Sequence, residues 1–235
     1  MKMIAFGDSV MKGIIPDPSR AKRYMISEDG FIAQCMRKLR IPITNYGRFG
    51  STVKEGEKLV DRHIELIGQA DYTLLEYGGN DCDFDWKAIA AAPEEVHNPR
   101  TPLQAFSAMY TGIIQKIRAS GSCPLMLSLP PLISERYFRF FSHEMNETER
   151  RNIMQWLGNT VSTIGEWHEL YNLEVFKIAS RMSVKLIDIT SIFYSRRKCP
   201  AYISEDGIHP NAAGHQIIAR TVYRELATLT ANAGI

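Results

Sequence analysis

The chain has 235 residues, of which 45% are hydrophobic, and 28 basic residues against 26 acidic ones give a formal net charge of +2. This length suits one α/β domain with a sizeable core, and the near-neutral balance gives no reason to expect a nucleic acid or a membrane as partner. No stretch approaches the roughly 18 apolar residues of a membrane-spanning helix, and the N-terminal apolar run is too short for a signal peptide, so we expect a cytoplasmic protein.

Short apolar runs alternate with longer helical patterns along the chain. Five runs have the near-continuous apolar content of strands that are covered on both faces. They are Lys2–Phe6, Ile43–Tyr46, Tyr72–Tyr77, Pro124–Leu129 and Val184–Ile189. Apolar residues at three- and four-residue spacing predict helices at Phe31–Leu39, Val53–Gly68, Pro102–Ser120, Glu147–Met182 (long enough for two) and Asn211–Leu229.

This alternation predicts parallel strand pairing, because each helix carries the chain back to the same end of the sheet. We therefore expect an α/β fold: a three-layer α/β/α sandwich around a flavodoxin-like, doubly wound, five-stranded parallel sheet. Residues 1–235 are expected to form one domain, with insertions at 83–102 and 130–146. In such a fold the functional site lies outside the carboxyl ends of the strands.

Nothing in the sequence indicates a metal or a cofactor. The four cysteines, Cys35, Cys82, Cys123 and Cys199, include no Cys-x-x-Cys pair and no zinc-binding pattern, so we expect reduced thiols. No Gly-x-Gly-x-x-Gly or phosphate-loop pattern follows the first strand, which argues against nucleotide binding.

Two motifs follow the first two predicted strands. Gly7-Asp8-Ser9 would present a serine at the edge of the site, although the same tripeptide is ordinary turn chemistry. Gly47 and Gly50 lie three residues apart, a spacing that lets the backbone approach a ligand closely and point an N–H at it. A capped loop between strand and helix is the alternative interpretation of the second motif.

Two further motifs lie after the third strand and near the C-terminus. Gly78-Gly79-Asn80-Asp81 places an amide side chain where it can offer its NH₂ group to an oxyanion. Asp206 lies three residues before His209, so its carboxylate can accept the ring Nδ1–H and leave Nε2 free to take a proton. Each motif alone is also compatible with a turn or a structural histidine.

In combination and in this order, the four motifs resemble those of the SGNH, or GDSL-type, hydrolase family. The resemblance extends from residue 3 to about residue 228. The family's Asn-x-Gly-x-x-Gly-x-Thr block is matched by Asn45, Gly47, Gly50 and Thr52. Val10 stands where the name-giving motif has leucine, and this apolar exchange requires only a packing adjustment.

The resemblance implies a role for each motif residue. Ser9 would be the nucleophile, His209 its base and Asp206 the acid that orients the histidine. The N–H groups of Ser9 and Gly50 and the side chain of Asn80 would form the oxyanion hole. The implied reaction is two-step acyl transfer, in which an ester acylates Ser9, the alcohol leaves and water releases the acyl group.

The residues that select the substrate are less clear from the sequence. We expect the pocket to be lined by Asp8, Arg48, Asp81 and Tyr137. A basic, aromatic rim for an anionic or sugar-bearing ester would use Arg20, Lys22, Arg23, Arg48, Arg136 and Arg139. The interpretation that we favour is that these charges are solvated and that the segment 136–141 is a helix that packs its aromatic residues into the core, because acidic residues supply opposite charge nearby.

These observations lead to one preferred function and two alternatives. We expect a serine esterase that hydrolyses a small acyl ester, with acetyl esters of carbohydrates within the family's range. An acyltransferase would use the same residues with another alcohol in place of water. A non-catalytic α/β binding module would leave Ser9 unreactive toward a fluorophosphonate. The expected partner is a small-molecule ester, and the sequence leaves the oligomeric state open.

Overall fold

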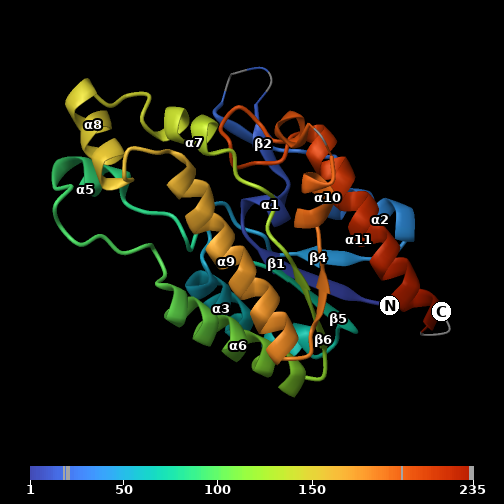
Figure 1. Cartoon of the computed structure of the whole chain (residues 1–235). Helices are drawn as coiled ribbons and strands as arrows, with labels where there is room; N and C mark the ends of the chain where they lie inside the picture. Colours follow the sequence, from blue (N-terminus) through green and yellow to red (C-terminus); the bar gives the residue numbers. More distant parts are fainter. Residues whose placement is uncertain (18, 20–21, 197, 233–235) are drawn as a thin grey trace.

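The computed structural model describes residues 1–17, 19, 22–196 and 198–232 (Figure 1). Its strands are β1 (Met3–Gly7), β2 (Ile14–Pro16), β3 (Tyr24–Ile26), β4 (Ile43–Asn45), β5 (Tyr72–Glu76), β6 (Cys123–Leu127) and β7 (Lys185–Ile187). Its helices are α1 (Ser9–Lys12), α2 (Phe31–Leu39), α3 (Val53–Arg62), α4 (Ile64–Ile67), α5 (Trp86–Ala91), α6 (Leu103–Ala119), α7 (Ser134–Phe141), α8 (Glu147–Trp156), α9 (Ser162–Arg181), α10 (Thr190–Tyr194), the 3₁₀ helix η1 (Cys199–Tyr202) and α11 (Ala212–Asn232). Within the described ranges, no helix is both long and apolar enough to cross a membrane.

Five parallel strands form the central sheet, in the order β4-β1-β5-β6-β7. This is the flavodoxin-like, doubly wound arrangement, so the predicted fold is confirmed. Gly7, at the end of β1, pairs with Glu76, at the end of β5. This register brings the segments that follow these two strands to the same edge of the sheet.

Helices cover both faces of the sheet (Figure 1). One layer contains α3, α4, α6 and α9, and the other contains α2, α10 and α11. Successive side chains of a strand point to opposite faces, and β1 shows the consequence directly. Ile4 and Phe6 pack in the first layer, whereas Met3 and Ala5 pack in the second, and all four are buried.

A third cluster of buried residues lies outside these two layers. We call it the cap cluster, and it consists of Trp86, Ile89, Ala90, Tyr137, Ile153, Leu157 and Ile164. These residues come from α5, α7, the end of α8 and the start of α9. Figure 1 shows α5 and α8 together at one side of the molecule, away from the sheet. That segments 83–102 and 130–146 are insertions stays a prediction.

All five predicted strands and the long predicted helices are present, with ends shifted by at most a few residues. The helix expected at Val53–Gly68 is interrupted at His63, which separates α3 from α4. Several short elements were not predicted, among them the antiparallel hairpin of β2 and β3 and the helix α5. They have too few residues to develop a clear periodic pattern.

Candidate active site

Ser9 lies immediately past the carboxyl end of β1, at the first position of α1. Asp8 caps this short helix by accepting a hydrogen bond from the Val10 N–H at 2.8 Å. Only glycine fits at position 7, because a Cβ there would lie 2.8 Å from the carbonyl oxygen of Glu76. The tight turn from strand to helix therefore holds Ser9 in a fixed, nearly buried position.

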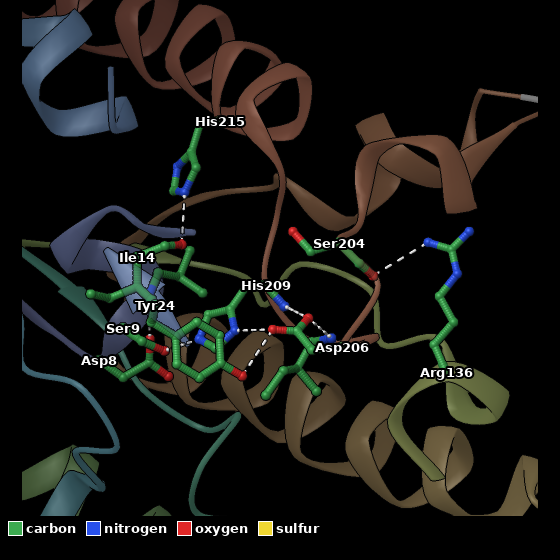
Figure 2. Close-up of polar contacts among 11 residues, drawn as sticks. Asp8, Ser9, Ile14, Tyr24, Arg136, Ser204, Asp206, His209 and His215 are labelled. Atoms are coloured by element: carbon green, nitrogen blue, oxygen red, sulfur yellow. Dashed lines mark hydrogen bonds and ion pairs between the residues drawn. The ribbon is translucent and has the colours of Figure 1, made fainter. Parts of the chain in front are cut away.

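The His209 ring reaches Ser9 from the loop that precedes α11 (Figure 2). Its Nε2 lies 2.9 Å from Ser9 Oγ, and its Nδ1 lies 2.7 Å from Asp206 Oδ2. The N–H groups of Ile208 and of His209 itself donate to Asp206 Oδ1 at 3.1 Å each, so the turn holds the carboxylate in place. Three side chains separated by up to 200 residues of sequence thus form one continuous hydrogen-bonded chain.

The loop that carries Asp206 is fastened to α7. Gly207 has a φ of +81°, and a Cβ at this position would lie 2.5 Å from the backbone nitrogen of Tyr137. The guanidinium of Arg136 donates to the carbonyl oxygen of Ile203 at 2.7 Å. It also donates to the carbonyl oxygen of Ser204 at 3.4 Å (Figure 2). The loop therefore cannot shift relative to α7 without losing these contacts.

Asp206 is held in the charged form that orients a histidine. Burial alone would raise its pKa, but the hydrogen bond from His209, the charge of that ring and the two backbone N–H groups bring the pKa of Asp206 below its ordinary value. The hydroxyl of Tyr24 adds a donor at 3.1 Å from Asp206 Oδ2. Burial, together with the Asp206 charge, raises the pKa of Tyr24, so this phenol stays protonated and donates.

Two of the predicted oxyanion donors lie on the loops after β4 and β5. Gly50 has a φ of +70°, and its N–H makes no hydrogen bond with the described residues. Asn80 Nδ2 donates to Asp8 Oδ2 at 2.8 Å. An amide nitrogen carries two hydrogens, so one of them remains for a ligand. The third predicted donor, the Ser9 N–H, is in the first turn of a helix, where N–H groups have no intrahelical partner.

Asp8, which accepts the hydrogen bond from Asn80, is itself in contact with a second buried acid, Glu76. Both residues are at most 3% exposed. Burial, followed by the charge of Asp8, raises the pKa of Glu76 well above its ordinary value, and burial also raises the pKa of Asp8. Glu76 was not singled out in the sequence because its position inside an apolar strand gives no sign of this pairing.

A cavity of about 420 Å³ opens beside Ser9, Asn80 and His209 and extends under the cap cluster. Of the four residues expected to line the pocket, Asp8 and Tyr137 border this cavity.

The other two expected lining residues, Arg48 and Asp81, lie elsewhere. Arg48 is exposed to solvent. Asp81 is fully buried, and both of its carboxylate oxygens accept from the Val53 N–H, at 3.0 and 3.1 Å. Its place in the structure is to hold the start of α3 against the loop that carries Asn80.

None of the basic residues proposed for a rim borders this cavity in the described part of the chain, and Arg20 lies outside the described residues. Arg23, Arg136 and Arg139 border a separate groove behind Asp206. Arg136 is committed to backbone carbonyls, and the Arg23 guanidinium lies 4.1 Å from the ring centre of Phe140. These contacts favour the interpretation of the charges as structural or solvated.

Aromatic residues around His209 were missed in the sequence. The ring centres of Tyr24 and Phe49 lie 5.0 and 6.0 Å from that of His209. Tyr24 comes from the hairpin of β2 and β3, and it contacts Asp206 across 182 residues of sequence. The short apolar runs around Ile14 and Tyr24 could have indicated the hairpin, but no local pattern indicates a contact of that range.

Comparison with known proteins identifies the family of this chain. The family model described as GDSL-like lipase/acylhydrolase matches residues 3–222. A curated relative, the uncharacterized protein YpmR of Bacillus subtilis, is 23% identical over 229 residues, which cover 94% of this chain and 80% of that protein.

Solved structures with the same fold include a lipase/acylhydrolase from Enterococcus faecalis, with a TM-score of 0.64, 16% identity and coverage of 96% of this chain and 94% of that one. A catalytic mutant of Axe2, an acetylxylan esterase from Geobacillus stearothermophilus, gives 0.62 at 18% identity, covering 95% and 93%. The esterase EstA from Pseudoalteromonas, inhibited by monoethylphosphonate, gives 0.62 at 12% identity, covering 97% and 98%. At identities this low, the structural likeness establishes the fold alone.

The buried Asp81 makes stability depend on pH. Burial raises the pKa of Asp81 from 3.8 to about 7, so between these values the folded chain holds a proton that the unfolded chain has released. Stability therefore falls as the pH rises through this window, by at most about 1.4 kcal/mol per pH unit. Asp81→Asn cannot titrate, so its Tm relative to the wild type should improve between pH 4.5 and pH 8. The exposed Asp29→Asn serves as control, and a Tm difference that is constant with pH would contradict this account.

The Tyr24 hydroxyl is expected to tune the acid that orients His209. Tyr24→Phe keeps the ring but removes one donor to a charged acceptor, so kcat/KM on an activated ester should fall by roughly three- to tenfold. Asp206 without this donor attracts the imidazole proton more strongly, so the acidic limb of the pH–rate profile should move to higher pH. Tyr194→Phe, at an exposed tyrosine, is the matched control. An unmoved limb would assign Tyr24 to packing alone.

Proposed function

We propose that this chain, which belongs to the GDSL-like lipase/acylhydrolase family and is an ester-hydrolysing serine hydrolase, uses Ser9 as its nucleophile. His209 is the general base, and Asp206 orients it. The observation that carries the proposal is the pair of hydrogen bonds of one imidazole, 2.9 Å to Ser9 Oγ and 2.7 Å to Asp206 Oδ2. This is the arrangement that activates a serine hydroxyl in acyl transfer.

In the first half of the reaction, His209 Nε2 takes the proton of Ser9 as Oγ attacks the carbonyl carbon of the ester. The carbonyl π electrons move onto oxygen, and the resulting oxyanion accepts hydrogen bonds from the N–H groups of Ser9 and Gly50 and from Asn80. When the tetrahedral intermediate collapses, the C–O bond to the alcohol breaks and His209 returns the proton to that leaving oxygen. In the second half, His209 takes a proton from water as the water oxygen attacks the acyl carbon. The bond between that carbon and Ser9 Oγ then breaks, His209 returns the proton to Oγ, and the acid is released.

The oxyanion donors can act without reorganisation. Gly50 has its left-handed backbone without substrate, and its carbonyl oxygen accepts from the Arg100 guanidinium at 3.0 Å. The hydrogen bond to Asp8 likewise leaves the second hydrogen of Asn80 Nδ2 free before substrate binds. Donors that are fixed before the reaction stabilise developing charge far better than mobile water does. Asp8 contributes indirectly, because it holds the Asn80 side chain in its orientation.

The acyl and alcohol groups of the substrate are a finer question. The sequence favours a small acyl group, with an acetyl ester of a carbohydrate as one candidate, and Axe2 is a structural neighbour that acts on acetylxylan. That likeness is one of fold, so the acetyl group stays a prediction for this chain. An acyltransferase would use the same residues, and product analysis with added alcohol acceptors separates transfer from hydrolysis.

The nucleophile is tested by Ser9→Ala. Because no other hydroxyl lies within reach of His209 Nε2 among the described residues, hydrolysis of a p-nitrophenyl ester should fall by a factor on the order of 10⁴ or more. Fluorophosphonate labelling followed by mass spectrometry should find the adduct on Ser9 in the wild type and none in the variant. Ser195→Ala, at an exposed serine, should behave as wild type. Equal labelling of wild type and Ser9→Ala would remove this residue from the mechanism.

The oxyanion role of Asn80 is tested by Asn80→Ala. The loss of one oxyanion donor should lower kcat by roughly 10²–10³-fold with a smaller change in KM, since the interaction forms in the transition state. A thermal melt checks that the loop remains folded. An unchanged kcat would exclude Asn80 from the site.

A further inference from the structure

The pocket beside Ser9 is walled mainly by aromatic and aliphatic side chains of the cap cluster and its neighbours. They include Phe84, Trp86, Tyr137, Trp156, Ile164 and Trp167. Within the described part of the chain, no lysine or arginine borders this pocket. An anionic group would lose its water there without gaining an opposite charge, whereas an apolar group would gain by burial.

The polar tips in these walls are turned toward one another. Asp83 accepts hydrogen bonds from Trp86 Nε1 at 2.9 Å and from the Tyr137 hydroxyl at 2.8 Å. The Trp86 N–H and the Tyr137 O–H are therefore already donated to Asp83 and do not offer hydrogens to the hydroxyls of a sugar. Further polar side chains border the pocket, namely those of His97, Asn98, Thr163, Trp167 and His168. His97 Nε2 lies 2.8 Å from the carbonyl oxygen of Ala92, and the Thr163 hydroxyl donates to that of Leu157 at 2.9 Å. Burial lowers the pKa of His168 to about 4, so this ring is neutral at pH 7.

The size of the pocket exceeds what an acetyl group needs. A methyl group takes up about the volume of a water molecule, roughly 30 Å³, which is under a tenth of the cavity of about 420 Å³. On the same scale a linear chain of six to ten carbons takes up roughly 180–300 Å³. Such a chain fits with room for the irregular packing of flexible groups.

The acyl half of the ester is the one that needs such a pocket. The acyl group stays joined to Ser9 Oγ between the two halves of the reaction, whereas the alcohol departs after protonation by His209. The ring of Phe49 stacks on that of His209 and is itself 54% exposed, so the surface of the molecule is close on this side of the histidine. An alcohol can leave toward solvent on that side, while the acyl chain remains under the cap cluster.

We propose that the pocket under the cap cluster binds the acyl chain, and that the enzyme prefers esters of linear fatty acids of about six to ten carbons over acetyl esters. This inference rests on the proposed function, since it takes Ser9 as the acylated residue. The cap cluster sets the chain length, and the motif residues carry out the chemistry.

The test is a series of p-nitrophenyl esters with two to sixteen acyl carbons. Each buried methylene should raise kcat/KM roughly fourfold until the chain fills the pocket, with a maximum between six and ten carbons and a decline beyond. A p-nitrophenyl ester of an eight-carbon chain that ends in a carboxylate should react at least tenfold more slowly than the octanoyl ester. Octyl acetate should gain little over ethyl acetate, because its long chain is on the alcohol.

Variants locate the effect. Ile164 is buried and borders the pocket, so Ile164→Phe should lower the ratio of octanoyl to acetyl kcat/KM at least tenfold and move the maximum to shorter chains. Leu173→Phe makes the same change of size on the same helix, at a residue that is 49% exposed and outside the pocket. It should leave the chain-length profile of the wild type unchanged. Thermal melts of both variants verify folding.

The possible failures are distinguishable. If a small fluorophosphonate does not label Ser9 and no ester is hydrolysed, the proposed function itself is wrong. If Ser9 is labelled and acetyl esters are hydrolysed with a flat or falling chain-length profile, the function stands and the acyl-pocket inference is overturned. A benzoyl ester that outpaces every linear ester, or a gain on octyl acetate equal to that on octanoyl esters, overturns it as well.

Discussion

The site depends on one imidazole that must satisfy two partners at once. His209 bonds to Ser9 on one side and to Asp206 on the other, and a displacement of about 1 Å would break either hydrogen bond. Ser9 is fixed by β1 in the sheet, whereas Asp206 and His209 lie in the loop before α11. The alignment of these parts is therefore set by how α11 packs on the sheet, through the same buried layer that contains Ala5 and Leu74.

The same edge of the sheet concentrates buried carboxyl groups, which is costly for folding. Asp8, Glu76 and Asp81 are nearly or fully buried there. Each has a task that offsets part of this cost: Asp8 orients Asn80 and caps α1, Glu76 supports Asp8, and Asp81 caps α3. The apolar layers on both faces of the sheet supply the stability that such an arrangement needs.

Much of this structure could be predicted from the sequence. The five strands and their parallel pairing followed from apolar runs that alternate with helical patterns. The segments after the carboxyl ends of those strands pointed to Ser9, Gly50, Asn80 and His209. What these predictions share is that each signal is local, within about ten residues of chain. Contacts such as Tyr24 to Asp206 or Glu76 to Asp8 join residues that are adjacent only after folding, so no local pattern encodes them. The helix α5 beside the pocket was missed for a related reason, because it is short and packs mainly on its neighbours in the cap cluster.

The attachment of α7 to the loop that carries Asp206 has a mechanical consequence. Arg136 binds the carbonyl of Ile203, and the Ile133 N–H donates to the carbonyl of Gly207 at 2.8 Å, so this helix and the acid that orients His209 move as one rigid part. Trp86 of α5 stacks on Phe141 of α7, with ring centres 4.3 Å apart, so the attachment extends from the acid to the far wall of the pocket. The substrate pocket and the reactive centre therefore share one support, and a substitution that displaces α7 would alter both the binding of the ester and the alignment of the histidine.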